Sequence, residues 1–261
     1  TQAAGLKAAF GTMTKPFHAG HAAAAGLVAA ELARRGFTSA ADVVEGAQGF
    51  ARTHAGDRPD GAALEQLAGR FLIRDTLFKY HAACYLTHAA IEAARQLREE
   101  HAIDTASIES VEVTVAPGLL GVCNIAEPHT GLEGKFSLRA TTALALLGVD
   151  TADLGTYSDA RMADPPLVRL RDRVRVVTRS GLASTRAHVA VRSAGRNLDA
   201  EADTGTPAAD LTKQRARLRG KFDALVTPVL GQQQAAKLAL AALTIDESPA
   251  AASLLGLARP Q

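Results

Sequence analysis

The sequence is poor in the residues that mark several classes of protein. It has no Trp, three Tyr and eight Phe among 261 residues, so an aromatic platform for stacking single-stranded nucleic acid is not expected. Its two cysteines, Cys84 and Cys123, are too few for a disulfide framework or a cysteine zinc site. This cysteine usage fits a reducing compartment, so we expect a cytoplasmic protein.

Long apolar runs and blocks of like charge are also missing. No apolar run reaches the length of a membrane span, and no signal peptide is visible. The net charge is +2 and the basic residues are scattered, which gives no argument for a nucleic-acid partner. We therefore expect neither a membrane nor a nucleic acid as partner.

The chain begins with Thr1, and "TQAAGLKAAF" is typical of the interior of a helical region, so we expect a piece of a longer protein. The stretch "PFHAGHAAAAGLVAAELARRG" predicts one long helix. Pro16 suits its first position, and Gly36 suits the residue just past its end.

Further along the chain, strands and helices are mixed. Thr87 is the expected N-cap of an amphipathic helix, "HAAIEAARQLREEH". Period-two alternation predicts a strand in "SIESVEVTVA". The stretches "VRVVTR" and "RAHVAVRS", joined by "SGLAST", predict an antiparallel hairpin, with a third short strand in "RNLDAEA".

This order of elements predicts an α+β fold rather than a doubly wound sheet. We expect three parts. Residues 1–70 form the remainder of an all-helical domain whose N-terminal part is missing, and residues 71–206 form a smaller domain with an antiparallel sheet and helices. Residues 207–261 form helices that return to the helical domain.

The stretch "GTMTKPFHAG" is a candidate anion site. If Pro16 opens the helix, the amides of Phe17 and His18 have no partners within the helix, and the helix end carries partial positive charge. Lys15 adds a full charge, which suits a carboxylate or phosphate. The alternative, slightly favoured by spacing alone, is a solvated Lys15 and a His18 that pairs with a carbonyl.

A second stretch, "FKYHAACYLTH", also places a lysine and histidines before a helix start: Lys79, His81 and His88, with Cys84 between them. Each residue has a simpler interpretation, with Lys79 as a surface charge, Cys84 as a small buried hydrophobe and His88 as an exposed first-turn residue. A metal is not expected, because the spacing of His81 and His88 is awkward on a helix and no carboxylate completes the set.

A third stretch, "EGKFSLRATT", supplies Lys135, Ser137 and Arg139 near another helix start, but alone it carries almost no information. A glycine-rich phosphate loop, a nucleophile elbow and a nucleotide fingerprint are all missing from the sequence. Nothing marks the partners that a pyridoxal site needs, so no cofactor is expected.

Taken in order, "GTMTKPFHAG", "KYHAACYLTHAAIEAA" and "KFSLRATTALALLG" resemble the MmgE/PrpD family, which includes 2-methylcitrate dehydratase, cis-aconitate decarboxylase and iminodisuccinate epimerase. The resemblance covers about residues 5 to 170 and is weaker beyond. It looks like the C-terminal portion only, because the family has a long helical segment before the first motif that supplies the acid/base aspartate and histidine.

The resemblance implies a site between a large helical domain and a smaller α+β domain. Such enzymes use no metal or organic cofactor, and they move a proton next to a carboxylate of a small di- or tricarboxylate. It implies that Lys15 and Lys79 hold substrate carboxylates and that His18 lines the site. We expect His88 and Arg139 to bind the substrate nearby; the catalytic acid and base are not assigned. Ala140 stands where the decarboxylase branch has a tyrosine, which argues against decarboxylation.

We therefore expect a lyase (dehydratase) or isomerase (epimerase), or a fragment of one, that forms a homodimer as the family usually does. The 261-residue chain alone is expected to be nearly inactive. The alternative is a non-catalytic remnant, or one half of a split enzyme, that binds only a ligand or a partner subunit.

Overall fold

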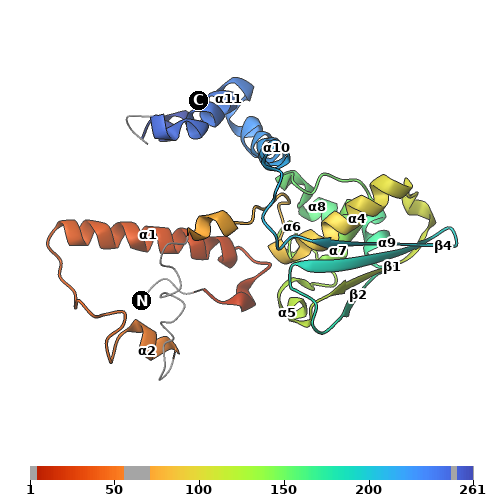
Figure 1. The fold of residues 1–261 in the computed structure, drawn as a ribbon, viewed down its shortest axis with the longest axis horizontal. Helices are drawn as coiled ribbons and strands as arrows, with labels where there is room; N and C mark the ends of the chain where they lie inside the picture. The colour runs from red at the N-terminus through yellow and green to blue at the C-terminus, as the bar shows by residue number, and fades with distance from the viewer. Residues whose placement is uncertain (1–4, 56–70, 248–251, 261) are drawn as a thin grey trace. The chain divides into compact units, whose positions relative to one another are not determined.

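The computed structural model describes residues 5–55, 71–247 and 252–260. The chain divides into two compact units, Thr1–Thr76 and Leu77–Gln261 (Figure 1). The parts of the expected N-terminal helical region that fall on residues 1–4 and 56–70 lie outside the described residues.

The first unit is built around one long helix. Its described elements are two 3-10 turns and two helices: Lys7–Ala9, α1 (Thr14–Arg34), α2 (Phe50–Ala55) and Leu72–Asp75. The predicted long helix is confirmed, and Gly36 follows its end with φ +85°. However, α1 begins two residues before Pro16, and the Phe17 amide donates to the carbonyl of Met13 at 3.3 Å. The prediction that Pro16 opens the helix is therefore wrong.

The second unit contains the sheet and most of the helices. Its described helices are α4 (His88–His101), α5 (Leu120–Cys123), α6 (Gly131–Gly134), α7 (Leu138–Leu146), α8 (Asp159–Met162), α9 (Pro165–Arg171), α10 (Leu211–Leu230), α11 (Gln232–Leu243) and α12 (Ala252–Leu257). Its strands are β1 (Ile108–Val115), β2 (Val174–Thr178), β3 (Arg186–Ser193) and β4 (Arg196–Asp203).

The four strands form a mixed sheet in the order β2-β1-β3-β4. β1 runs parallel to β2, with Val111 opposite Val174, and antiparallel to β3. The predicted strands are confirmed, but the hairpin between β2 and β3 and the all-antiparallel sheet are wrong. The physical reason is that β1 is the most buried strand and takes a central position, so β2 and β3 pair with its two edges instead of with each other.

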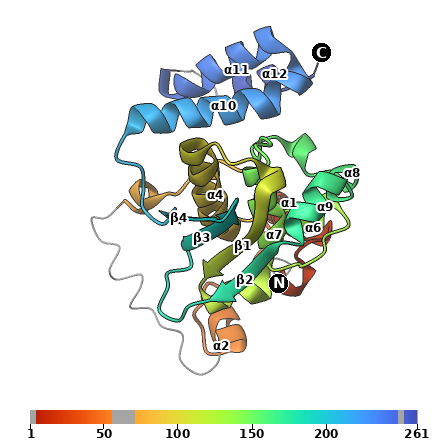
Figure 2. The same cartoon turned by 90° about the vertical axis from the view of Figure 1, so that its right-hand side faces the viewer.

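Helices α4 and α7 pack against one face of this sheet (Figure 2). Ile91, Ala94 and Leu97 of α4 are fully buried there, and Val111 and Val113 of β1 face them in the same core cluster. The helical and strand-forming segments thus confirm the α+β class. Burial of these side chains is the main source of stability in the unit.

The ends of α4 show how local sequence sets its length. Thr87 occupies the predicted N-cap position, but its hydroxyl donates to the carbonyl of Cys84 at 2.8 Å instead of capping the helix. At the other end Ala102 has φ +45°, the left-handed conformation that commonly terminates a helix.

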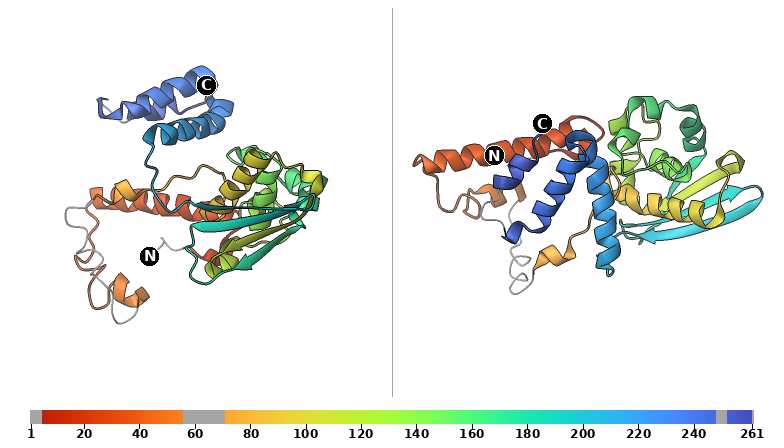
Figure 3. Two further views of the ribbon diagram at one scale, coloured as in Figure 1. Left: turned by 45° about the vertical axis from the view of Figure 1, so that its right-hand side comes forward. Right: turned by 90° about the horizontal axis from the view of Figure 1, so that it is seen from above.

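The chain after residue 207 is helical over its described part, as predicted. α10, α11 and α12 follow one another and pack in sequence (Figure 3). Among the described helices, none combines the length and apolar character required to cross a bilayer.

We predict that Leu97→Ala lowers the free energy of unfolding by about 2–5 kcal/mol, because it removes a buried side chain between helix and sheet. The matched control is Gln96→Ala on the exposed face of the same helix, with an expected change of about 0.5 kcal/mol or less. Urea denaturation followed by circular dichroism measures both. Equal effects of the two substitutions would contradict the described packing.

Candidate functional site

The segment before α4 brings a buried histidine against two polar side chains. His81 is 2% exposed. Its Nδ1 lies 2.7 Å from Oγ1 of Thr151, in the loop after α7, and its Nε2 lies 3.0 Å from Oε1 of Glu92 on α4. Two fixed partners hold the ring in one orientation, so His81 is a structural link between three segments of the second unit.

Glu92 is held from a second side by Arg217 of α10, which donates to the same carboxylate oxygen. The Arg217 guanidinium also lies over the ring of Tyr80, 3.7 Å from its centroid. Burial by itself raises the pKa of Glu92, but the hydrogen bonds from His81 and Arg217 outweigh it and lower the pKa to about 2. The carboxylate is therefore charged at neutral pH.

His88, the first residue of α4, lies next to this network. Its ring centroid is 4.8 Å from that of His81 in an edge-on contact and 4.9 Å from that of Tyr85. Its side chain is 1% exposed, so the interpretation as an exposed first-turn residue is wrong. Its Nε2 has no hydrogen-bond partner among the described residues.

The surroundings keep His88 neutral. Burial, followed by the charges of His81 and Lys79, lowers its pKa to about 3. A neutral imidazole with one unoccupied nitrogen can donate or accept a hydrogen bond according to its tautomer. Nε2 of His88 is thus a buried polar atom whose hydrogen-bonding capacity the described residues leave unused.

Two further predicted residues of the second unit lie near the same helices. The Nζ atom of Lys79 is 3.3 Å from the carbonyl oxygen of Ala83, and its charge acts on His88. Arg139 lies in the first turn of α7, which packs against α4, and its buried Nε finds no acceptor in the described part of the chain. The structure therefore brings Lys79 and His88 together at the start of α4.

Lys15 and His18 lie on α1 in the first unit. The Lys15 Nζ is 5.1 Å from the ring centroid of Phe10. The His18 ring packs so closely on Gly5 that a Cβ there would lie 2.3 Å from its Nδ1. The anion site that we expected from free amides after Pro16 is not formed in that way, because the Phe17 amide is already bonded within the helix.

Comparison with family models gives two matches. The model described as MmgE/PrpD C-terminal domain matches residues 81–247, which is more than half of the chain. The chain belongs to the MmgE/PrpD family. The model described as MmgE/PrpD N-terminal domain matches residues 1–62. The expectation of a C-terminal portion only is therefore wrong, because this MmgE/PrpD protein also contains sequence of the N-terminal domain. A search of curated proteins finds no match.

The third motif of this MmgE/PrpD chain has mainly structural contacts. The Ser137 hydroxyl caps α7 by accepting from the amide of Ala140 at 3.1 Å. Lys135 lies over the ring of Tyr157, 5.6 Å from its centroid, and burial lowers the pKa of its ammonium group.

Sequence reasoning missed the Glu92–Arg217 pair and the role of Thr151. Glu92 and Arg217 are 125 positions apart, so no local pattern joins them. The one available signal was the position of Glu92 between the buried Ile91 and Ala93, where an acidic side chain needs a partner.

We predict that His88 makes folding stability pH-dependent between pH 7 and 5. The unfolded residue takes up a proton near its ordinary pKa of 6.5, whereas the folded residue stays neutral down to about 3. The unfolded state therefore binds more protons in this window, and stability falls as the pH is lowered. Glu92 titrates below the window.

The measurement is the free energy of unfolding of the wild type and His88→Gln at pH 7 and pH 5. We expect a smaller loss of stability in His88→Gln. His129→Gln, which replaces an exposed histidine, serves as the control and should keep the wild-type slope. An unchanged slope in His88→Gln would show that His88 is not held neutral by the fold.

Proposed function

We propose that this protein acts on a small di- or tricarboxylate by cofactor-independent proton transfer next to a carboxylate, in a dehydration or an epimerisation. The observation that carries the proposal is the buried, neutral His88 with an unoccupied nitrogen beside the cationic Lys79, in a chain that belongs to the MmgE/PrpD family. Both groups suit a ligand with carboxylate and hydroxyl oxygens.

The proposed proton transfer needs a cation that stabilises the developing charge and a base that accepts the proton. Removal of a proton next to a carboxylate creates negative charge on that carboxylate, so a fixed cation is needed to stabilise it. Lys79 fills this role, with Lys15, His18 and Arg139 as further groups that hold the substrate. The reaction also needs a proton acceptor, which works best when its pKa lies near the operating pH.

The low pKa of His88 supports a role in binding instead of proton abstraction. A pKa of about 3 is far below neutrality, so His88 is a weak base at pH 7. Its free Nε2 is better suited to a hydrogen bond with a substrate hydroxyl or carboxyl group. The catalytic acid and base are not assigned to residues. We further propose that the protein is cytoplasmic and forms a homodimer.

Because the chain also contains sequence of the N-terminal domain, we replace the expectation of a nearly inactive chain with the prediction that it exchanges a substrate C–H proton with D2O. Proton NMR on a panel of di- and tricarboxylates detects the exchange. Lys79→Ala and Lys15→Ala should each lower kcat/KM by about 10- to 100-fold, since each removes a charged hydrogen bond to the substrate. Lys213→Ala on the exposed surface of α10 is the control for Lys79 and should retain activity. Lys7→Ala is the control in the first unit.

The exchange and binding measurements distinguish an enzyme from a protein that only binds a ligand or a partner subunit. Exchange that survives Lys79→Ala unchanged would refute the proposed role of that lysine. Stabilisation by a panel compound without any exchange would instead favour the alternative, a chain that binds a ligand or a partner subunit without catalysis. Ligand binding is measured as a rise in melting temperature.

A further inference from the structure

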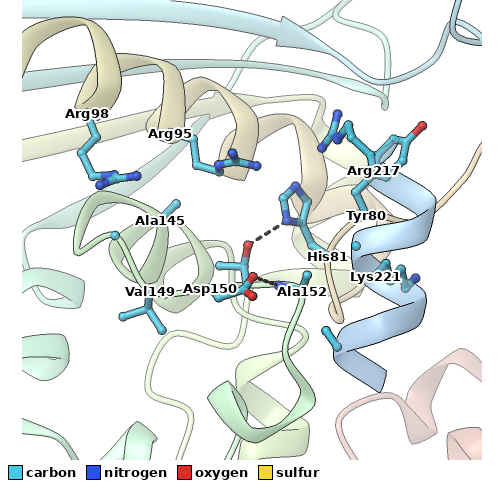
Figure 4. A pocket seen from close by; sticks show the side chains of 14 residues that line it. Tyr80, His81, Arg95, Arg98, Ala145, Val149, Asp150, Ala152, Arg217 and Lys221 are labelled. Atoms are coloured by element: carbon cyan, nitrogen blue, oxygen red, sulfur yellow. Dashed lines mark hydrogen bonds between the residues drawn. The ribbon is translucent and has the colours of Figure 1, made fainter. Parts of the chain in front are cut away.

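The Leu77–Gln261 unit contains a cleft lined mainly by charged side chains. A cleft of about 410 Å³ lies between α4, the loop after α7 and α10 (Figure 4). Arg95 and Arg98 extend into it from α4, Arg217 and Lys221 line it from α10, and Asp150 lies on the loop. None of the five residues proposed to hold the substrate is among the described residues that line this cleft.

The charges around the cleft do not cancel. Its four lining cations face one lining carboxylate, Asp150, and two more carboxylates, Glu92 and Glu99, lie beside it on α4. Glu92 is already bonded to His81 and Arg217. Positive charge therefore exceeds negative charge at this surface.

The pairs made by Glu99 are weak. Arg95 approaches this glutamate at 3.4 Å and Arg98 at 3.7 Å, and the side chain of Glu99 is 55% exposed. Water and salt screen such exposed pairs, so they neutralise little of the charge on the two arginines.

The side chain of Arg98 also lacks one hydrogen-bond acceptor among the described residues. Its buried Nε has no acceptor among the described residues, which is a costly state for a buried donor. The guanidinium is brought close to the loop by Gly148, where a Cβ would lie 2.9 Å from Nη1. In addition, burial lowers the pKa of Lys221, so a nearby anion would favour its charged form.

We propose that this cleft binds a small anion that carries two or more negative charges on oxygen atoms, either a polycarboxylate or a phosphate. Guanidinium groups present paired N–H donors that match the oxygen atoms of both carboxylates and phosphates. The volume falls within the range of small-molecule sites. Lys221 donates to the backbone carbonyl of Lys79, so the cleft adjoins the proposed substrate site. It is an additional site because its side chains, Arg98 and Lys221, differ from Lys79 and His88.

The test titrates the full chain with inorganic phosphate, succinate or citrate at constant ionic strength, and follows binding by calorimetry and melting temperature. We expect saturable binding of at least one anion. A response to phosphate alone identifies a phosphate site, and a response to succinate or citrate identifies a polycarboxylate site.

Three variants locate the binding. Arg98→Gln combined with Lys221→Gln should weaken it by about 10-fold or more, because two charged donors are lost. Lys213→Gln combined with Arg215→Gln changes the net charge equally at exposed positions of α10 and should bind like the wild type. A polycarboxylate can also bind at the proposed substrate site, so Lys79→Ala should remove that binding event and keep the one that the Arg98 and Lys221 substitutions weaken.

If the double substitution of Arg98→Gln and Lys221→Gln prevents folding, a variant that fills the cleft replaces it. Gly220 lines the cleft from within α10, and a Cβ there would meet nothing within 4 Å. Gly220→Leu therefore adds a side chain at the cleft whose Cβ meets no neighbour, and leucine is the better helix former. We expect it to fold and to lose anion binding.

Several outcomes would overturn the proposal. These are the absence of a saturable response to all three anions in the wild type, an unchanged set of binding events in Gly220→Leu or in the folded charge variant, and loss of every binding event in Lys79→Ala.

Discussion

The second unit depends on one half-buried carboxylate, that of Glu92. It accepts hydrogen bonds from His81, which precedes α4, and from Arg217 of α10, so a single charged group ties together segments from opposite ends of the unit. A carboxylate in this position is costly unless it is paired, and loss of one partner would leave an uncompensated charge. The network therefore constrains where α10 can lie against α4.

The same network separates two neighbouring environments. On one side His81 presents its ring edge to His88 and helps to keep that histidine neutral. On the other side His81 and Arg217 form part of the wall of a cationic cleft. A single buried histidine thus lies between a neutral polar group suited to hydrogen bonding and a cluster of charges suited to an anion. His81 is therefore in contact with both environments.

The sequence was sufficient to predict the elements whose signal is local. The strands β1, β3 and β4, the helix after Thr87 and the helical C-terminal region follow from the spacing of apolar residues. Three ordered motifs were enough to identify the family. Strand partners could not be predicted, because alternation shows which side of a strand is buried but does not specify its neighbour.

The burial of His88 also could not be predicted, since it results from the rings of His81 and Tyr85 packing over the start of the helix. Whether Lys15 and Lys79 serve one site depends on the two units together, which no local pattern determines.

The central position of β1 has a consequence for the order of folding. Val111 pairs with Val174 on one edge and with Val191 on the other, and both partners come much later in the chain. During synthesis β1 and α4 therefore emerge before either edge of the strand can be paired. Non-local strand pairing of this kind slows folding, and an apolar strand with open edges is prone to pair with other chains. β1 is thus the centre of the finished sheet, but both of its edges stay open in the nascent unit until β2 and β3 have been made.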